Sequence, residues 1–326
     1  MASDLLSIGL SGAKAARTAL EVTSQNISNA STAGYVRRSV SLMEVSGAGG
    51  FGTLTDVSLS GVRVDKVVRN ADLFRQAEVR RTGADVARAD AEVTGLENVE
   101  AAIDQSRVYP AMVGFEGALQ QLAGDPTDAS LRSGVIEAAR TLSDTFNIAS
   151  NSLDSAESGL QFDAQAGTNS VNTLSAELAR VNLRLSRAAD ATSDQTTLMD
   201  QRDNLLQQIS QYANIATTFN TDGSVDVRIG GTSGPQIVQG GTATAIAMTT
   251  AANGTISFAA GASAVTLTGG SLAGQALTLT KLDQIRTDLN TTAATVINTV
   301  NAAQTAGAAL DGTNGQPLFN GTDAKT

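Results

Sequence analysis

The stretch S-Q-N-I-S-N-A-S-T-A-G-Y-V-R-R, from Ser24 to Arg38, separates two parts of the chain that differ in pattern. Before it, apolar residues recur at three- and four-residue intervals, which predicts a helix over residues 3–29. The polar residues in its middle are expected to end that helix. Tyr35 and an arginine pair then lead into a predicted hairpin. Because the stretch offers no catalytic grouping, we interpret it as a joint between a helix and a folded body.

The predicted helix carries one apolar stripe. The stripe is formed by Leu6, Leu10, Ala13, Leu20 and Ile27, with Arg17 and Ser24 as its polar positions. It is narrow and contains alanine, so this helix alone would bury little apolar surface. We therefore expect it to pair with another helix in the manner of a coiled coil.

The composition excludes several classes of site. Histidine and cysteine are both absent, which rules out Ser-His and Cys-His nucleophiles, imidazole or thiolate zinc sites and disulfides. Carboxylate chemistry and oxygen-ligated calcium or magnesium remain open. Aromatic residues are only 3% of the chain, so its cores must be built from Ala, Leu, Val and Ile, as suits packed long helices. We expect no cofactor.

The net charge of −10 argues against a polyanionic partner such as nucleic acid. Residues 1–110 hold 12 Lys/Arg and 13 Asp/Glu, so nearly all the acidic excess lies beyond them. The first residues, M-A-S-D-L-L-S-I-G-L, lack the basic leader of a secretory signal peptide. No stretch approaches the roughly 20 apolar residues of a membrane span, so no membrane insertion is expected.

The pattern predicts an α+β fold that is elongated and multidomain. It comprises an N-terminal coiled-coil-type helix with its linker (1–35), a hairpin plus helical bundle (36–213), a small antiparallel β domain (214–280), and a return helix with a turn-rich tail (281–326). The bundle is indicated most clearly by the heptad that starts at Val171.

Other features of the bundle are less regular. The glycine tract Gly47–Gly52 reads as a hairpin tip or loop. Valines 79, 86 and 93 lie near heptad positions of a second helix, predicted from Asn70 to Arg107. Shorter patterns follow from Pro110 and from Asp125, and the glycines and serines of Ser155–Gly159 are expected to interrupt or end a helix. A turn or interruption is expected around Asp190–Thr197.

The segment between Ile229 and Thr280 contains no charged residue. Apolar alternation, which extends to Leu277 and Leu279, predicts strands. Asp222-Gly223 and Asn253-Gly254 are turn signals. A disordered, low-complexity linker is the alternative interpretation of the same composition.

The motif L-M-D-Q-R-D contains a pair of aspartates that is a candidate for catalysis. Asp200 and Asp203 lie three residues apart, with Gln201 and Arg202 between them, so they could form an acid/base couple. Caps and ion pairs at the start of a helix explain them more simply. Four arginines between residues 75 and 88 are interleaved with acidic residues, as on a solvated helix face.

These motifs resemble a known family. Flagellar rod, hook and hook-associated proteins share the pattern N-(I/L)-A-N-x-x-T-x-G-(Y/F), which is matched by Asn26, Ile27, Asn29, Thr32, Gly34 and Tyr35, with Ser28 at the alanine position. Tyrosine followed by basic residues, together with D-Q-R-D at 200–203, is most similar to the FlgK family of hook-associated proteins, which form the hook-filament junction.

The resemblance implies a secreted, extracellular structural protein of the bacterial flagellum, and not an enzyme. Such a protein is exported by the type III route and serves motility. The implied partners are other copies of the chain in a ring, the hook protein, the second junction protein towards the filament and a type III export chaperone. The family also has a C-terminal helix that pairs with the N-terminal one. Nothing after Thr326 supplies it, so residues 1–30 are expected to be poorly ordered or paired between chains.

Two other functions remain as alternatives. The chain could be another axial flagellar protein, such as hook or rod, although those are mostly β beyond their terminal helices. It could also carry a surface adhesin or enzyme module, with residues 214–280 as the active part.

Overall fold

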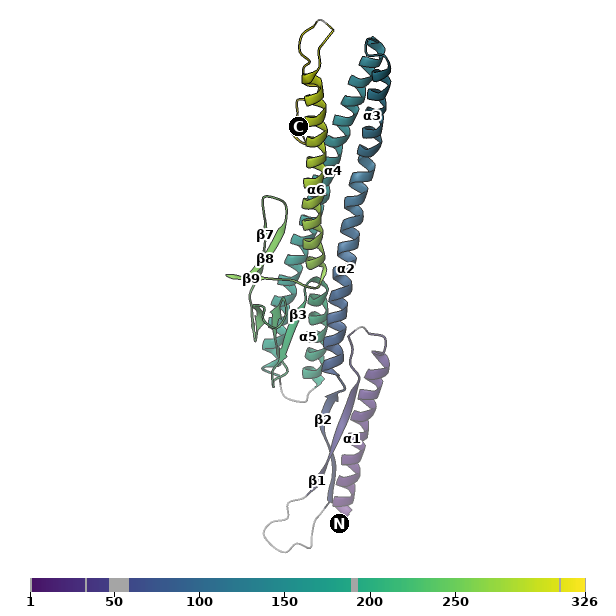
Figure 1. Cartoon of the computed structure of the whole chain (residues 1–326). Helices are drawn as coiled ribbons and strands as arrows, with labels where there is room; N and C mark the ends of the chain where they lie inside the picture. Colours follow the sequence, from purple (N-terminus) through teal and green to yellow (C-terminus); the bar gives the residue numbers. More distant parts are fainter. Residues whose placement is uncertain (1, 33, 47–58, 189–192, 311, 326) are drawn as a thin grey trace. The chain divides into compact units, whose positions relative to one another are not determined.

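The computed structural model describes residues 2–32, 34–46, 59–188, 193–310 and 312–325 (Figure 1). Helices and antiparallel strands are both present, which confirms the predicted α+β class. The chain forms two compact units, each assembled from separate stretches. The first contains Met1–Ala84, Ser170–Ile246 and Ala260–Leu267, and the second contains Asp85–Asn169, Ala247–Ala259 and Thr268–Thr326.

The helices are mostly long. They are α1 (Ala2–Ser28), α2 (Leu73–Ser106), α3 (Val108–Gly124), α4 (Ala129–Leu185), α5 (Ser193–Tyr212) and α6 (Ser271–Ala306). Between α2 and α3, Arg107 has a φ of 58°, a left-handed conformation that ends one helix and starts the next.

The strands form separate small sheets. The hairpin consists of β1 (Arg38–Ser46) and β2 (Leu59–Arg69). A four-stranded antiparallel sheet has the order β3 (Ile215–Phe219), β4 (Val225–Ile229), β5 (Gln236–Gln239) and β6 (Thr242–Ala243). A three-stranded sheet has the order β7 (Ile246–Thr250), β8 (Ile256–Ala260) and β9 (Ser263–Val265).

In the first unit, α1 lies along the hairpin (Figure 1). The hairpin register sets Arg38 opposite Arg69, and Asp65 is an extra residue on β2 where the register shifts. The predicted loop Gly47–Gly52 lies outside the described residues.

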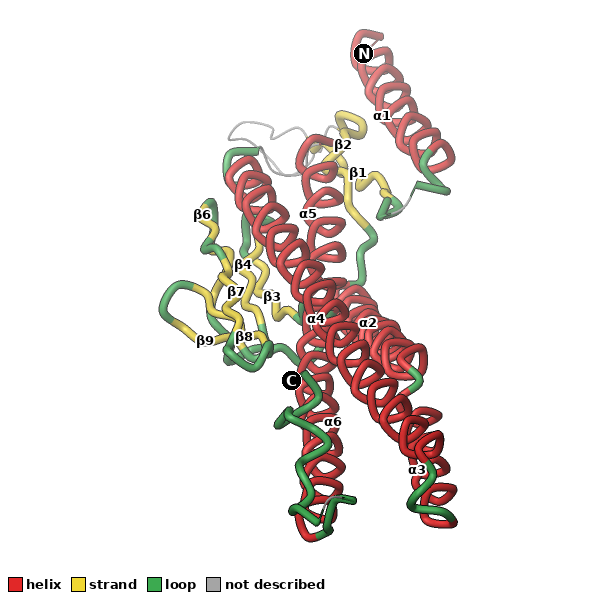
Figure 2. Tube along the Cα trace, turned by 90° about the horizontal axis from the view of Figure 1, so that it is seen from above, coloured by secondary structure: helices red, strands yellow, loops and turns green. Residues whose placement is uncertain are grey.

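The four-stranded sheet lies next to α4 (Figure 2). Its strand β4 turns Val225, Val227 and Ile229 inward, and all three are fully buried. The predicted turn at Asp222-Gly223 is confirmed, because Gly223 adopts a φ of 82° and the chain reverses between Asn220 and Ser224. Burial along one side of α4 also confirms the heptad, with Val171 and Leu178 fully enclosed.

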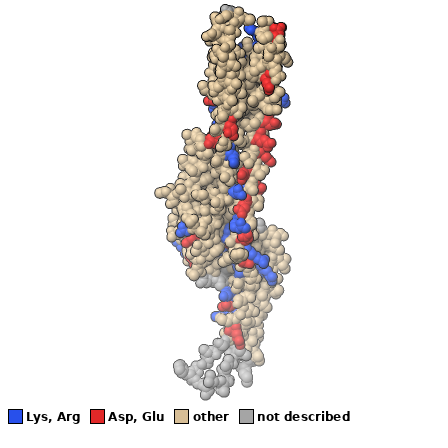
Figure 3. Space-filling model, in the orientation of Figure 1, with Lys and Arg blue, Asp and Glu red and all other residues tan. Residues whose placement is uncertain are grey.

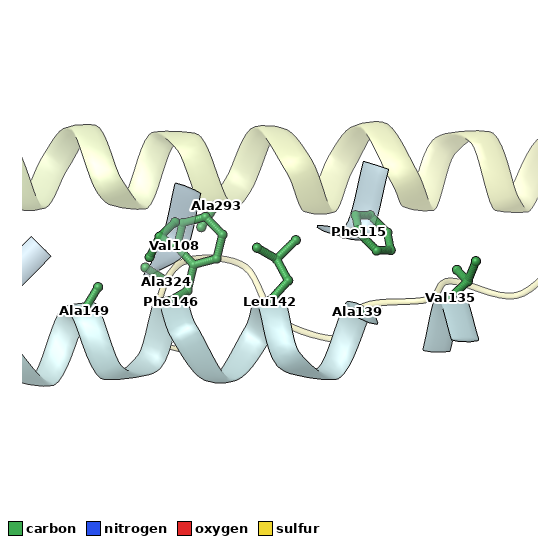
Figure 4. Close-up of a cluster of buried hydrophobic side chains, with 9 residues drawn as sticks. All are labelled: Val108, Phe115, Val135, Ala139, Leu142, Phe146, Ala149, Ala293 and Ala324. Carbon is green, nitrogen blue, oxygen red and sulfur yellow. The ribbon is translucent and has the colours of Figure 1, made fainter. Parts of the chain in front are cut away.

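The second unit is a helical bundle. Its largest cluster of buried side chains comes from α3, α4, α6 and the segment that follows α6 (Figure 4). Leu142, Phe146 and Ala149 on α4 point towards α6, where Ala293 meets them. A second cluster, from α2, α4 and α6, surrounds Leu153, which is fully buried. Apart from Phe115 and Phe146 the buried side chains of these clusters are aliphatic, as the composition predicts.

The predicted break at Ser155–Gly159 is wrong, because α4 continues through it. The hydroxyls of Ser155 and Ser158 donate to the carbonyls four residues earlier, so both are hydrogen-bonded inside the continuous helix. Leu153 and Leu160 on either side are buried. Packing therefore outweighs the low helix propensity of glycine and serine.

One further expectation needs correction. The segment 214–280 is not strand to its end, because α6 begins at Ser271 and contains Leu277 and Leu279. Two-residue spacing over so few residues cannot separate a strand from a helix edge. The expected interruption between two helices is confirmed, because α4 ends at Leu185 and α5 begins at Ser193; residues 189–192 lie outside the described part of the chain.

The heptad valines of α2 do not face the core. Val79, Val86 and Val93 are 56%, 58% and 54% exposed. The buried face instead carries small residues such as Ala84 and Gly95. At Gly95 a Cβ would lie 2.7 Å from Cγ2 of Thr278, so α6 approaches here more closely than a valine would permit.

Candidate functional site

Helix α1 has two different faces. The predicted stripe is open: Leu6, Leu20 and Ile27 are 77%, 70% and 73% exposed. The opposite row, with Ala15 and Val22, is buried. Within the single chain α1 is an ordered helix that packs on the hairpin, and the expected pairing of residues 1–30 between chains stays a prediction. The predicted stripe nevertheless has no cover among the described residues, and Leu10 and Ala13 are exposed with it.

After α1 the chain turns through the polar stretch. The backbone N–H of Thr32 donates to the carbonyl of Asn29, and that of Tyr35 donates to the carbonyl of Thr32. Gly34 has a φ of 80°, and a Cβ there would lie 3.4 Å from Nδ2 of Asn204 on α5. Glycine therefore serves both the left-handed turn and the close approach.

Asn26 joins the end of α1 to the start of the hairpin. Its Oδ1 accepts from the backbone N–H of Arg38 at 2.9 Å, and its Nδ2 donates to the carbonyl of Arg38 at 2.8 Å. The hydroxyl of Tyr35 donates to the same Oδ1 at 3.0 Å. The Arg38 guanidinium lies 5.3 Å from the centre of the Tyr35 ring. The side chains of the first signature therefore bind one another.

The two signatures meet in a buried ion cluster. Asp200 on α5 pairs with Arg38 at 2.8 Å and with Arg69 at 2.9 Å, and Arg69 also pairs with Asp203 at 2.7 Å. None of these four side chains is more than 15% exposed. We call Arg38, Arg69, Asp200 and Asp203 the clamp. It fixes both strands of the hairpin base to α5, and buried pairs of this kind are costly to break.

Arg202 extends the clamp towards the four-stranded sheet. It pairs with Asp203 at 2.7 Å, donates to the carbonyl of Gly223 and lies 4.6 Å from the centre of the Phe219 ring. Burial lowers the pKa of Arg202, and the neighbouring Asp203 carboxylate opposes that shift. Burial also lowers the pKa of Arg80, which donates to Thr217 of β3 at 3.5 Å.

Asp200 and Asp203 could form either an acid/base couple or caps and ion pairs, and the contacts of the clamp favour ion pairs. The predicted ion pairs are present, but neither residue caps α5, which begins at Ser193. Both carboxylates are held by guanidiniums, which disfavours an acid/base couple. Gln201 lies between them with an exposed side chain. Pattern analysis missed Arg69 as a partner, because a single arginine at the end of a strand carries no local signal.

A polar groove of about 690 Å³ lies beside the clamp. Asn29, Thr32 and Gly34 line one wall, and Gln201 and Asn204 line the other. The predicted pairing within four residues is present for Arg75, Arg81 and Arg88, but only the first two pairs are exposed, since Arg88 and Glu92 are half-buried. Arg80, by contrast, is buried.

The described residues contain neither a metal-binding cluster of acidic side chains nor a helix able to span a membrane. Within them no three acidic side chains gather to hold a metal ion. Nor does a helix in that part of the chain combine the length and apolarity that crossing a bilayer requires.

Comparison with known families places the chain. A family model described as the helical domain of flagellar hook-associated protein FlgK matches residues 93–319. The chain belongs to the FlgK family. A second model, for flagella basal body rod proteins, matches residues 6–35, which contain most of α1 and the turn after it.

Several curated relatives of this FlgK-family chain are named flagellar hook-associated protein 1. The Bacillus subtilis protein is 27% identical over 223 residues, covering 64% of this chain and 43% of its own length. The Salmonella typhimurium protein is 26% identical over 337 residues, covering 98% and 59%. The chain thus spans about half the length of these relatives. The solved junction protein FlgK of Burkholderia pseudomallei shares the fold, with a TM-score of 0.63 and 20% identity over 74% of this chain and 46% of that one.

Proposed function

We propose that this chain is a structural subunit of the bacterial flagellum that assembles at the junction between hook and filament. Membership of the FlgK family supports the proposal. The observation that carries it is the pairing of an open apolar stripe on α1 with a buried clamp at the foot of that helix. Another helix can bury the stripe of such a helix, while the clamp connects the end of α1 to the body.

In the proposed assembly, residues 1–35 form the assembly helix and linker, and the remaining chain forms the body. Other copies of the chain cover the α1 stripe in a ring. The hook protein lies on one side of the ring and the second junction protein on the other. The subunit reaches this place outside the cell by type III export with its chaperone. The role is structural and not catalytic, which agrees with the pairing of the clamp carboxylates with arginine side chains.

The test uses the full-length protein in cells that lack their own copy. One variant replaces three residues of the open stripe with serine: Leu6→Ser, Leu10→Ser and Leu20→Ser. The matched control replaces three exposed apolar residues of the second unit: Val113→Ser, Ile148→Ser and Phe162→Ser. We expect the stripe variant to be exported but absent from hook tips, with motility lost, whereas the control assembles. Normal incorporation of the stripe variant would refute the proposal.

The alternative of a hook or rod protein is disfavoured, because the family model that matches most of the chain is that of the FlgK helical domain. Localisation of the tagged protein distinguishes the two. Label along the length of the hook, and not at its tip, would favour the alternative.

A further inference from the structure

Ser11 and Gly61 make a contact between α1 and the hairpin that neither sequence signature contains. The backbone N–H of Val62 on β2 donates to Oγ of Ser11 at 3.2 Å, and that hydroxyl donates to the carbonyl of Ile8 at 2.7 Å. The contact lies at the end of the hairpin away from Arg38, to which Asn26 is bound. Helix α1 is therefore held at two points.

Glycine is required at position 61 for two reasons. Its φ is 98°, a conformation that other residues adopt only with strain. A Cβ there would also lie 2.2 Å from Oγ of Ser11 and 3.3 Å from Cα of Ile8. The second atom belongs to the helix backbone, which cannot swing aside as a side chain can. Any larger residue must push α1 away from the strand.

The two points are equally spaced on both partners. From Ser11 to Asn26 the helix rises about 22 Å, at 1.5 Å per residue. From Val62 to Arg69, which lies opposite Arg38, the strand spans about 23 Å, or nearer 20 Å if the extra residue at the register shift is allowed for. Both attachments can therefore form together without bending either element.

The two points also set the rotation of α1. Successive helix residues turn by about 100°, so Ser11, Ala15, Val22 and Asn26 fall within an arc of about 60°. The open stripe from Leu6 to Ile27 is centred about 180° from that arc. Fixing the inner row thus points the stripe directly away from the hairpin.

We propose that Ser11 and Gly61 are positioning residues that fix the rotation of α1, so that its open stripe faces outward in one direction. The inference rests on the proposed function in one respect: the fixed rotation of α1 would present the stripe to a second copy of the chain. The attachment itself is a property of the single chain and can be measured without assembly.

The chain contains no cysteine, so an introduced cysteine is its only thiol. We would place one on the inner row with Val22→Cys, or on the open stripe with Leu20→Cys, and measure the rate of reaction with a thiol reagent. In the parent background the inner thiol should react far more slowly than the outer one. Adding Ser11→Ala should raise the inner rate about two- to tenfold, the range expected for one lost hydrogen bond. Adding Gly61→Ala should raise it by about tenfold or more.

Gly12→Ala is the matched control, because a Cβ at Gly12 meets nothing within 4 Å. It should raise neither rate, since alanine favours the helix at an open position. Ser11→Ala keeps the test valid even if Gly61→Ala unfolds the hairpin, since alanine fits a helix well. The proposal is overturned if the inner thiol is already fast in the parent, or if it stays slow in both variants.

Hook-tip incorporation of the same variants separates the two proposals. A faster inner thiol with reduced incorporation supports both. A faster inner thiol with normal incorporation supports the proposal that Ser11 and Gly61 fix the rotation of α1. The same result shows that this rotation is not needed for assembly.

Discussion

Asparagine side chains tie helices to strands or loops at four places in the described chain. Each bonds both the N–H and the C=O of one residue, as a neighbouring strand would. The pairs are Asn26 with Arg38, Asn172 with Ile246, Asn182 with Val225, and Asn301 with Phe319. An amide carries one acceptor and one donor group, which suits a peptide unit. Asparagine is a weak helix former, so its place within helices reflects these contacts.

Replacing one such amide by a carboxylate tests this role. Asn182 is 1% exposed and donates to the carbonyls of Val225 and Gly240. In Asn182→Asp both donations are lost at neutral pH, which should cost about 2–4 kcal/mol of unfolding free energy. Urea unfolding measures it. Asn151→Asp, at an exposed site on the same helix, should change stability by under about 0.5 kcal/mol.

The loss in Asn182→Asp should depend on pH. Burial beside two carbonyls raises the folded-state pKa of an aspartate above its unfolded value. Protonation therefore favours the folded form, and the destabilisation should shrink as the pH falls through that raised pKa. A destabilisation that grows on acidification would contradict the assigned bonds.

The clamp makes a second prediction at this scale. Arg69→Met removes the cation shared by Asp200 and Asp203, and leaves those buried carboxylates undercompensated. It should lower the unfolding free energy by about 3–5 kcal/mol. Arg180→Met breaks the exposed pair with Glu177 and should cost less than about 1 kcal/mol. Equal losses in the two variants would show that the clamp is not a buried network.

Substitution of two helical glycines in the second unit tests whether α4 is continuous and how closely α6 packs. A Cβ at Gly159 on α4 meets nothing within 4 Å, whereas at Gly274 on α6 it would lie 2.3 Å from the carbonyl oxygen of Arg88. Because α4 is continuous, Gly159→Ala should stabilise by about 0.5–1 kcal/mol. Gly274→Ala should destabilise by about 1–3 kcal/mol. Thermal unfolding of the two variants shows whether each substitution raises or lowers the stability. A neutral or harmful Gly159→Ala would indicate that the helix is broken there.

Elements were predictable wherever a local period is strong. The heptad from Val171 and the helix end at Asn29 both agree with the structure. Apart from the short alternation at Leu277 and Leu279, which a helix edge can mimic, the failures arise from packing between segments distant in sequence. The valines of α2 face outward because small residues on its other side admit α6. The clamp partner Arg69 was missed because a contact with α5 leaves no pattern in its own strand.

At the scale of the whole molecule, charge is divided unevenly. The first unit has 15 Lys/Arg and 14 Asp/Glu, whereas the second has 7 and 18. Acidic side chains are prominent on the part of the surface that belongs to the second unit (Figure 3). They include the last part of α2, where Glu97, Glu100 and Asp104 approach the negative end of the helix dipole. The second unit is therefore under electrostatic self-repulsion.

Salt should relieve that repulsion. Raising the salt concentration from about 0.01 M to about 0.5 M shortens the screening length from roughly 30 Å to a few ångströms. The second unit should become more stable. Hydrogen exchange at its core amides measures this as a higher free energy of opening. Amides of the first unit, where the charges balance, serve as the internal reference. A fall in the stability of the second unit would contradict the charge argument.

The asparagine contacts also bear on how the protein ages. Asparagine loses its amide slowly in water, most readily where glycine follows it, and each loss leaves a carboxylate. In this chain the residues after the four joining asparagines are Ile27, Thr173, Leu183 and Ala302. The Asn-Gly pairs lie elsewhere, at residues 253, 314 and 320. The four joining asparagines therefore lack the following glycine that makes deamidation fastest. Deamidation should begin at the Asn-Gly turns, before it reaches these four asparagines.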